Sequence, residues 1–157
     1  MLLFFVNWIM EKIIYKNDQG NLSIIMPTQE ALQHMSIYEI AKKDVPTGKN
    51  FRIINSFELP VDKTFRNAWT IKDLKIIVDL DKAKKIWKNI IRSCRIPVLE
   101  KLDTELIIAT EKKLNTSDIL NKKEELRNLP NQVDDVKSLD QIKNVWSNLL
   151  NNNEMEK

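Results

Sequence analysis

Hydrophobic and polar residues follow two different periods along this chain, one before residue 79 and one after it. In the first half, short runs rich in β-branched residues are bounded by turn residues, which is typical of strands. In the second half, apolar residues recur at steps of three or four, the period of an α-helix. The pattern predicts an α+β fold with a small β-rich N-terminal head and short helices at residues 10–78. A C-terminal helical arm or hairpin of about three helices follows at residues 79–150.

The head is predicted to contain six short extended segments and two short helices. The extended segments cover residues 12–16, 22–26, 51–54, 57–59, 68–71 and 75–78. The sequence Asn-Asp-Gln-Gly at 17–20 is a natural hairpin connection between the first two. Thr28 can cap a helix over 29–35, and Ser36 with Glu39 forms a capping box that opens a helix to about residue 43. The segments 68–71 and 75–78 are expected to pair, with Trp69 and Ile71 beside Ile76 and Val78.

The longest predicted helix covers residues 80–111. Its apolar positions are Leu80, Ala83, Trp87, Ile90, Cys94, Val98, Leu102, Leu106 and Ala109. Pro97 lies inside this pattern and removes one backbone hydrogen bond, so a kink or a break is expected there. Further helices are predicted at 118–128 and at 139–150, the second opened by a capping box at Ser138 and Gln141.

The two ends of the chain differ from the rest in composition. The first ten residues, MLLFFVNWIM, are apolar but are shorter than the roughly 20 residues that cross a bilayer. They lack the basic start and the small-residue cleavage site of a secretory signal. They are either an extra edge strand or, as we favour, an extension over 1–9 with the natural start at Met10. The polar tail 151–157 is expected to fray.

Composition narrows the possible chemistry. The net charge of +3 is too small to indicate a nucleic-acid partner. A single cysteine, Cys94, and a single histidine, His34, exclude an intramolecular disulfide and a two-histidine metal pair, and they favour a reducing cytoplasm. Only Gly20 and Gly48 occur, so a glycine-rich phosphate loop cannot be built. No enzyme activity, metal or cofactor is therefore expected.

The clearest candidate binding feature is a basic stripe on the predicted helix after Asp79. It comprises Lys84, Lys85, Lys88, Arg92 and Arg95. At 100° per residue these side chains fall within an arc of about 100°, opposite the apolar positions. The stripe is predicted to face solvent, either as an ordinary solvated face or as a docking surface for phosphates or an acidic protein. It lacks the interleaved aromatic residues of single-strand nucleic-acid binders, which makes DNA or RNA the less favoured partner.

Three tryptophans, Trp69, Trp87 and Trp146, lie on predicted apolar faces, where burial in a core is expected. Tryptophan is also a frequent anchor of protein interfaces. Trp69 is therefore kept as a candidate partner-binding residue beside the basic stripe.

Several segments resemble small proteins of tailed phages and prophages. Residues 62–69 (DKTFRNAW) resemble a segment that precedes a hairpin in such proteins, and residues 78–83 (VDLDKA) resemble the helix start that follows it. Residues 92–103 (RSCRIPVLEKLD) resemble its continuation, and residues 123–130 (KEELRNLP) are similar to a segment of phage tail assembly chaperones. The tryptophan-rich signature usual in those chaperones is absent.

The resemblance implies a non-enzymatic factor that helps to assemble a phage tail or tail fibre and binds a structural phage protein. Such a factor would act in the cytoplasm of the bacterial host, without a membrane. One alternative is a structural component of the virion. Another is a small nucleic-acid-binding or host-modulating protein that uses the basic stripe. The oligomeric state stays open, although the apolar stripe is compatible with self-association.

Overall fold

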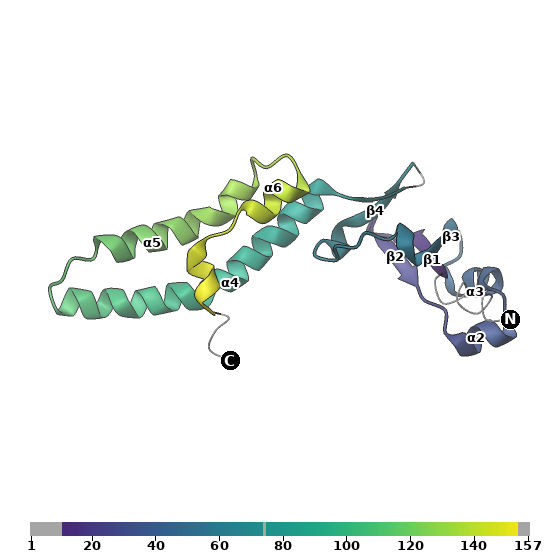
Figure 1. Ribbon diagram of the computed structural model, residues 1–157, viewed down its shortest axis with the longest axis horizontal. Coiled ribbons are helices and arrows are strands. Elements are labelled where there is room, and N and C mark those ends of the chain that lie inside the picture. The colour runs from purple at the N-terminus through teal and green to yellow at the C-terminus, as the bar shows by residue number, and fades with distance from the viewer. Residues whose placement is uncertain (1–10, 74, 154–157) are drawn as a thin grey trace. The chain divides into compact units, whose positions relative to one another are not determined.

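The computed structural model describes residues 11–73 and 75–153, and it confirms the α+β class. The chain divides into two compact units with the boundary between Asp79 and Leu80, one residue after the expected position. We call them the β-rich unit and the helical unit and describe each by itself (Figure 1). The predicted extension at 1–9 and residues 154–157 of the predicted tail lie outside the described residues.

A three-stranded antiparallel sheet forms the centre of the β-rich unit. Strands β1 (Glu11–Lys16), β2 (Leu22–Ile25) and β3 (Phe51–Asn55) lie in the order β2-β1-β3. The predicted turn joins β1 and β2, because the Asn17 side chain accepts hydrogen bonds from the backbone N–H groups of Gln19 and Asn21. Gly20 follows with a φ of 75°, a conformation that glycine adopts without strain.

Two short helices cover one face of this sheet. Helix α2 (Gln29–His34) is capped by Thr28, and α3 (Ile37–Asp44) opens with the predicted capping box of Ser36 and Glu39. Successive residues of a strand point to opposite faces. Ile13 and Tyr15 of β1 therefore face the helices, and Lys12 and Ile14 face the other way. The resulting core contains Ile13, Ile40, Ala41 and Val45.

A second, two-stranded sheet pairs β4 (Trp69–Lys72) with β5 (Lys75–Val78). Trp69 lies opposite Val78 and Ile71 opposite Ile76, as predicted. The prediction of an extended segment at 57–59 was wrong, because residues Ser56–Glu58 form the short 3-10 helix η1. Asn55 and Glu58 form a capping box there, and these local hydrogen bonds replace those of a strand. A second 3-10 turn, η2 (Arg66–Ala68), leads into β4.

Helix α4 (Leu80–Glu111) runs the length of the helical unit without interruption. Of the kink or break expected at Pro97, the break does not occur, because α4 continues through this residue; the axis of α4 bends about midway along its length (Figure 1). Proline leaves the carbonyl of Ser93, four residues earlier, without its helical donor. Ser93 and Pro97 are both exposed, so water can satisfy that carbonyl at little cost.

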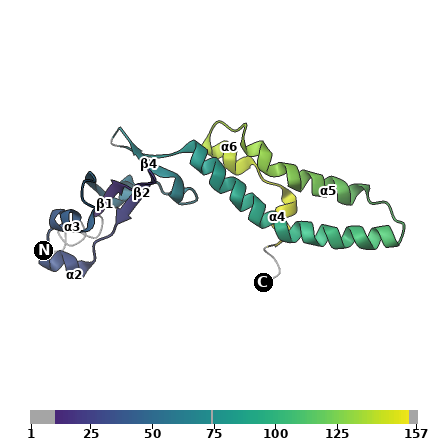
Figure 2. The ribbon, with the colours of Figure 1, turned by 180° about the vertical axis from the view of Figure 1, so that it is seen from behind.

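The rest of the chain folds back onto α4. Helix α5 (Ser117–Asn128) runs antiparallel to it, followed by η3 (Leu129–Val133), α6 (Leu139–Asn144) and η4 (Asn148–Asn153) (Figure 2). The prediction of one helix over 139–150 was wrong, since α6 ends at Asn144. The Val145 carbonyl, free of the helix, accepts a hydrogen bond from the Trp87 indole at 3.0 Å. Residues 151–153, predicted to fray, continue η4.

The core of the helical unit therefore draws on α4, α5, η3 and η4. Its buried members include Ile91 and Leu102 of α4 and Leu126 of α5, with Val133 and Leu150 from the returning chain. Polar contacts reinforce it, with Lys123 paired to Asp103 and the Ser147 hydroxyl donating to Glu125. The apolar stripe of α4 is thus covered over its N-terminal half by the chain's own C-terminal segment.

Candidate protein-binding surfaces

In the structure, three of the five cations of the predicted basic stripe bond to other parts of the same chain. The Lys84 ammonium donates to the backbone carbonyl of Asp134 at 2.8 Å, and Lys88 pairs with the Asp134 carboxylate at 2.5 Å. The Arg95 guanidinium donates to the carbonyls of Leu126 and Arg127, both at 3.0 Å. These carbonyls lie at the C-terminal end of α5, where orphan acceptors and the helix dipole favour a cation.

The prediction that the whole stripe faces solvent was therefore wrong for Lys84, Lys88 and Arg95, which are half-buried. Lys85 and Arg92 are exposed, and Arg92 donates to Asn89 on the same helix at 3.2 Å. Helical spacing placed the five cations on one face correctly, but it carried no information about which segment returns along that face. The structure thus leaves two cations of the stripe in solvent.

Of the three candidate tryptophans, Trp69 lies in the core of the β-rich unit, and Trp87 and Trp146 pack against each other in the helical unit. Trp69 is 2% exposed and belongs to the core of the β-rich unit, as its apolar surroundings predicted. Trp87 and Trp146 are half-buried and pack against each other with their ring centroids 5.6 Å apart. The Trp146 indole donates to Asn151 at 2.7 Å, so both members of the pair hold the C-terminal segment in place.

An apolar groove of about 530 Å³ opens on the β-rich unit, and we call it the Phe57 groove. Its walls come from β1, β2, the segment around η1, and the approach to β4. The lining residues are Lys12, Ile24, Met26, Ser56, Phe57, Leu59, Pro60, Val61, Lys63, Arg66 and Trp69. Met26, Phe57 and Val61 are 62%, 76% and 98% exposed, which is unusual for large apolar side chains that lie together around one hollow.

Trp69 is the one predicted site residue that lines this groove. The sequence prediction missed Met26, Phe57 and Val61, because Met26 and Phe57 were assigned to extended segments and Val61 to the flank of the second. A detectable signal was the concentration of apolar residues in the turn-rich stretch 57–61, which includes Pro60. A second polar hollow lies nearby and shares Arg66, with Asn17, Gln19 and Asn67 among its lining residues.

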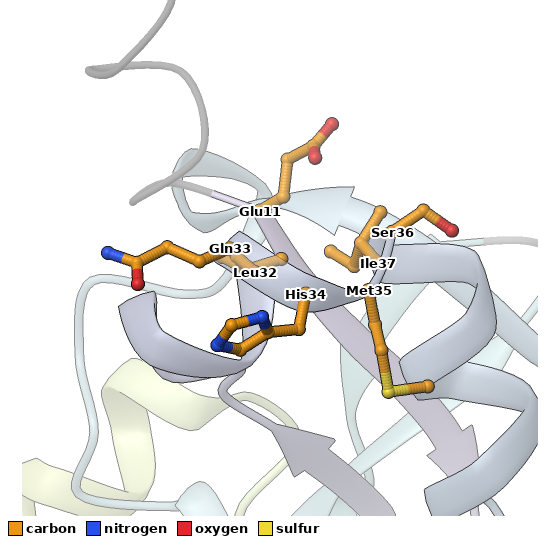
Figure 3. A pocket seen from close by; sticks show the side chains of 7 residues that line it. All are labelled: Glu11, Leu32, Gln33, His34, Met35, Ser36 and Ile37. Carbon is orange, nitrogen blue, oxygen red and sulfur yellow. The ribbon is translucent and has the colours of Figure 1, made fainter.

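A smaller hollow of about 370 Å³ lies between the start of β1 and the turn from α2 to α3 (Figure 3). Glu11, Gln33, His34 and Ser36 contribute polar side chains, and Figure 3 shows the first three pointing away from one another. His34 is exposed in the last turn of α2. The hollow therefore brings together no convergent set of catalytic or metal-binding groups.

The far end of the α4–α5 hairpin also carries exposed apolar side chains. Ile107 and Ile108 lie on α4, Leu114 on the connection, and Leu120 on α5. Ile96, eleven residues before Ile107, lies on the same side of α4 because eleven residues complete about three turns. Polar residues separate the two, so these side chains do not form one continuous patch along the helix.

Within residues 11–73 and 75–153, no three His, Cys, Asp or Glu side chains are grouped so that they could hold a metal ion. None of the described helices is both long and apolar enough to cross a membrane. Cys94 is a free, half-buried thiol on α4. Comparison with protein-family models, with curated proteins and with solved structures found no match.

Proposed function

We propose that this protein is a non-enzymatic assembly factor that binds a structural protein of a phage tail or tail fibre. The phage context comes from the resemblance of residues 62–69, 78–83, 92–103 and 123–130 to small phage proteins. The binding role is supported by the Phe57 groove, an apolar surface left open beside three cations. A factor of this kind shields apolar segments of its partner until the partner assembles, in the cytoplasm of the bacterial host.

The observation that carries the proposal is the exposure of Met26, Phe57 and Val61 together. An apolar patch of this kind on a small protein marks an interaction surface more often than it marks chance. Shielding a partner through the apolar face of α4 finds less support, because α5, η3, α6 and η4 already cover much of that face. The Phe57 groove on the β-rich unit is therefore the surface that we propose for the partner.

Nucleic-acid binding through the basic stripe is the weaker proposal. Three of its five cations are bonded to the chain's own carbonyls and to Asp134. Binding to phosphates would have to compete with these contacts for Lys84, Lys88 and Arg95. Lys85 and Arg92 alone would provide two phosphate contacts, where specific complexes commonly use about six to ten.

The test is co-expression of the full chain with the structural proteins encoded beside it. Recovery of a tail or fibre protein in soluble form, where that protein is insoluble alone, would support the assembly role. Absence of the chain from purified particles would separate an assembly factor from a structural component of the virion. Failure to recover any neighbouring structural protein, together with strong retention on heparin, would overturn the proposal in favour of nucleic acid.

A further inference from the structure

The Phe57 groove has a charge pattern that narrows the class of its occupant. Three of its lining side chains, Lys12, Lys63 and Arg66, are cationic, and none of the described lining residues carries a carboxylate. Among the described residues, the side chains of Lys63 and Arg66 form no ion pair or hydrogen bond. The groove thus combines an apolar floor with a positive rim, in which the side chains of Lys63 and Arg66 have no partner among the described residues.

Trp69 adds a second, independent observation. Its indole Nε1 is buried and has no hydrogen-bond acceptor within the part of the chain that the structure describes. A buried indole N–H without an acceptor costs free energy, since water is lost and nothing replaces it. Trp69 is also one of the residues that line the groove, so the groove borders a buried donor without a described acceptor.

We propose that the Phe57 groove binds a protein segment in which large apolar side chains are flanked by Asp and Glu. The apolar side chains would pack on Phe57, Met26 and Val61, and the carboxylates would pair with Lys63 and Arg66. Apolar contact supplies most of the affinity, and the opposite charges select the partner and speed its approach. This inference rests on the proposed function and specifies the kind of segment that the partner presents.

A single-stranded nucleic acid is the other anionic occupant that a groove with an exposed aromatic ring could take. Such sites stack successive bases on several aromatic side chains. Here Phe57 is the one exposed ring among the described lining residues, since Trp69 is buried and the other apolar lining residues are not aromatic. The composition of the groove favours a peptide.

The direct test uses the full chain and a fluorescein-labelled ten-residue peptide in which Asp and Glu alternate with Phe, Leu and Ile. Fluorescence anisotropy gives the Kd. The variant Lys63→Glu/Arg66→Glu is expected to weaken binding by about tenfold or more, because two attractive contacts become repulsive. Phe57→Ser is expected to weaken it about fivefold, since a partly exposed ring contributes less than a buried anchor.

Matched controls change the same residue types elsewhere. Lys72→Glu/Lys75→Glu reverses two exposed cations that lie opposite each other in β4 and β5, outside the groove. Leu114→Ser removes an exposed apolar side chain from the helical unit. Both are expected to leave the Kd within about twofold, as distant surface changes usually do. Equal losses in the controls and in the groove variants would overturn the assignment.

A photo-crosslinking residue in place of Phe57 identifies the occupant in cells that also make the neighbouring structural proteins. Crosslinks to an acidic, apolar segment of one of them support the inference. Crosslinks confined to residues 1–10 of the same chain, to a second copy, or to nucleic acid overturn it. If a structural protein is recovered by co-expression and the groove variants do not weaken its binding, the groove assignment fails while the assembly role stands.

Discussion

The two units of this protein use cationic side chains in opposite ways. In the helical unit, Lys84, Lys88 and Arg95 donate to carbonyls and a carboxylate of the same chain. In the β-rich unit, the side chains of Lys63 and Arg66 line an apolar groove and bond to no described residue. Both sets would be described as basic surface from sequence. The difference arises because the chain folds back over the first set and leaves the second beside an open hollow.

The same contrast holds for aromatic residues. Trp87 and Trp146 pack together and donate their indole hydrogens to the chain, whereas the buried Trp69 indole has no acceptor among residues 11–73 and 75–153. The hydrogen bonds of Trp87 and Trp146 stabilise the fold of the helical unit. The unsatisfied Trp69 donor and the exposed apolar residues of the Phe57 groove instead leave a surface on which a partner could bind. The comparison teaches that the candidate site is the place where the chain's own contacts are incomplete.

The largest expected effect comes from opening the core of the helical unit alone. Leu126→Ala removes a fully buried side chain and is expected to lower the free energy of unfolding of that unit by about 3 kcal/mol. Hydrogen exchange of peptides from residues 80–111 and from residues 11–55 measures the two units separately. Leu120→Ala, at a half-exposed position on the same helix, is the control and should change stability by less than about 0.5 kcal/mol. An equal loss of protection in both units would contradict their separate cores.

The next effect concerns the buried cation of α5. Lys123 is nearly fully buried and pairs with Asp103, whose side chain is about half exposed. Asp103→Ala leaves the ammonium without its partner and is expected to cost about 2 kcal/mol, below the 3 to 5 kcal/mol typical of a fully buried pair. Lys123→Met, which removes the buried charge, should cost less than about 1 kcal/mol. Urea denaturation followed by circular dichroism at 222 nm measures both, and equal costs would show that the charge is not the cause.

A smaller effect is expected from the hydrogen bond between Trp87 and the C-terminal segment. Trp87→Phe keeps an aromatic ring but removes the hydrogen bond to the Val145 carbonyl, at an expected cost of about 1 kcal/mol. Near-ultraviolet circular dichroism should lose part of the signal of the Trp87–Trp146 pair. Unchanged hydrogen exchange in residues 139–150 would show that this bond does not hold the segment on α4.

The comparison of the two cation sets can be measured directly. Because Lys88 pairs with an exposed carboxylate, a double-mutant cycle of Lys88→Ala and Asp134→Ala should give a coupling of about 0.5 kcal/mol. Lys63→Ala should leave the free energy of unfolding unchanged within about 0.3 kcal/mol, since it removes no internal contact. A marked loss for Lys63→Ala would mean that the groove cations also serve the fold.

The smallest effect is a pH dependence at the start of α3. Hydrogen bonds from the Ser36 side chain and backbone lower the pKa of Glu39 below its ordinary value of 4.5. A lowered pKa in the folded state means that the contribution to stability is present above pH 4.5 and is lost as the pH falls through the lowered value. Glu39→Gln should therefore narrow the gap in Tm between pH 7 and pH 3. Lys43→Gln on the same helix is the control, and an identical gap in Glu39→Gln and the wild type would exclude the effect.

Much of the local structure could be predicted from sequence. The caps at Thr28, Ser36 and Ser138, the Asn17 turn and the last hairpin depend on residues close together in the chain, and the structure contains each of them. The hairpin pairs residues 69–72 with 75–78, its first strand one residue later than predicted, and the Gln141 side chain of the predicted box accepts from Lys137 instead of Ser138. The failures lie where distant contacts decide. Helix α6 ends at Asn144 because the Val145 carbonyl accepts a hydrogen bond from the Trp87 indole, 58 positions earlier. The spacing of apolar residues within one helix does not report contacts between residues so far apart.

The sequence by itself determined the α+β class, the two parts of the chain, the long helix and the common face of its five cations, since each follows from a local period. Only the tertiary structure decided that three of those cations close onto the returning chain and that Phe57, Val61 and Met26 meet in one groove. Those outcomes depend on which surfaces approach each other across tens of residues. Which side chains are buried and which hydrogen bonds form depend on how distant segments pack together, so the sequence of one segment alone does not determine them.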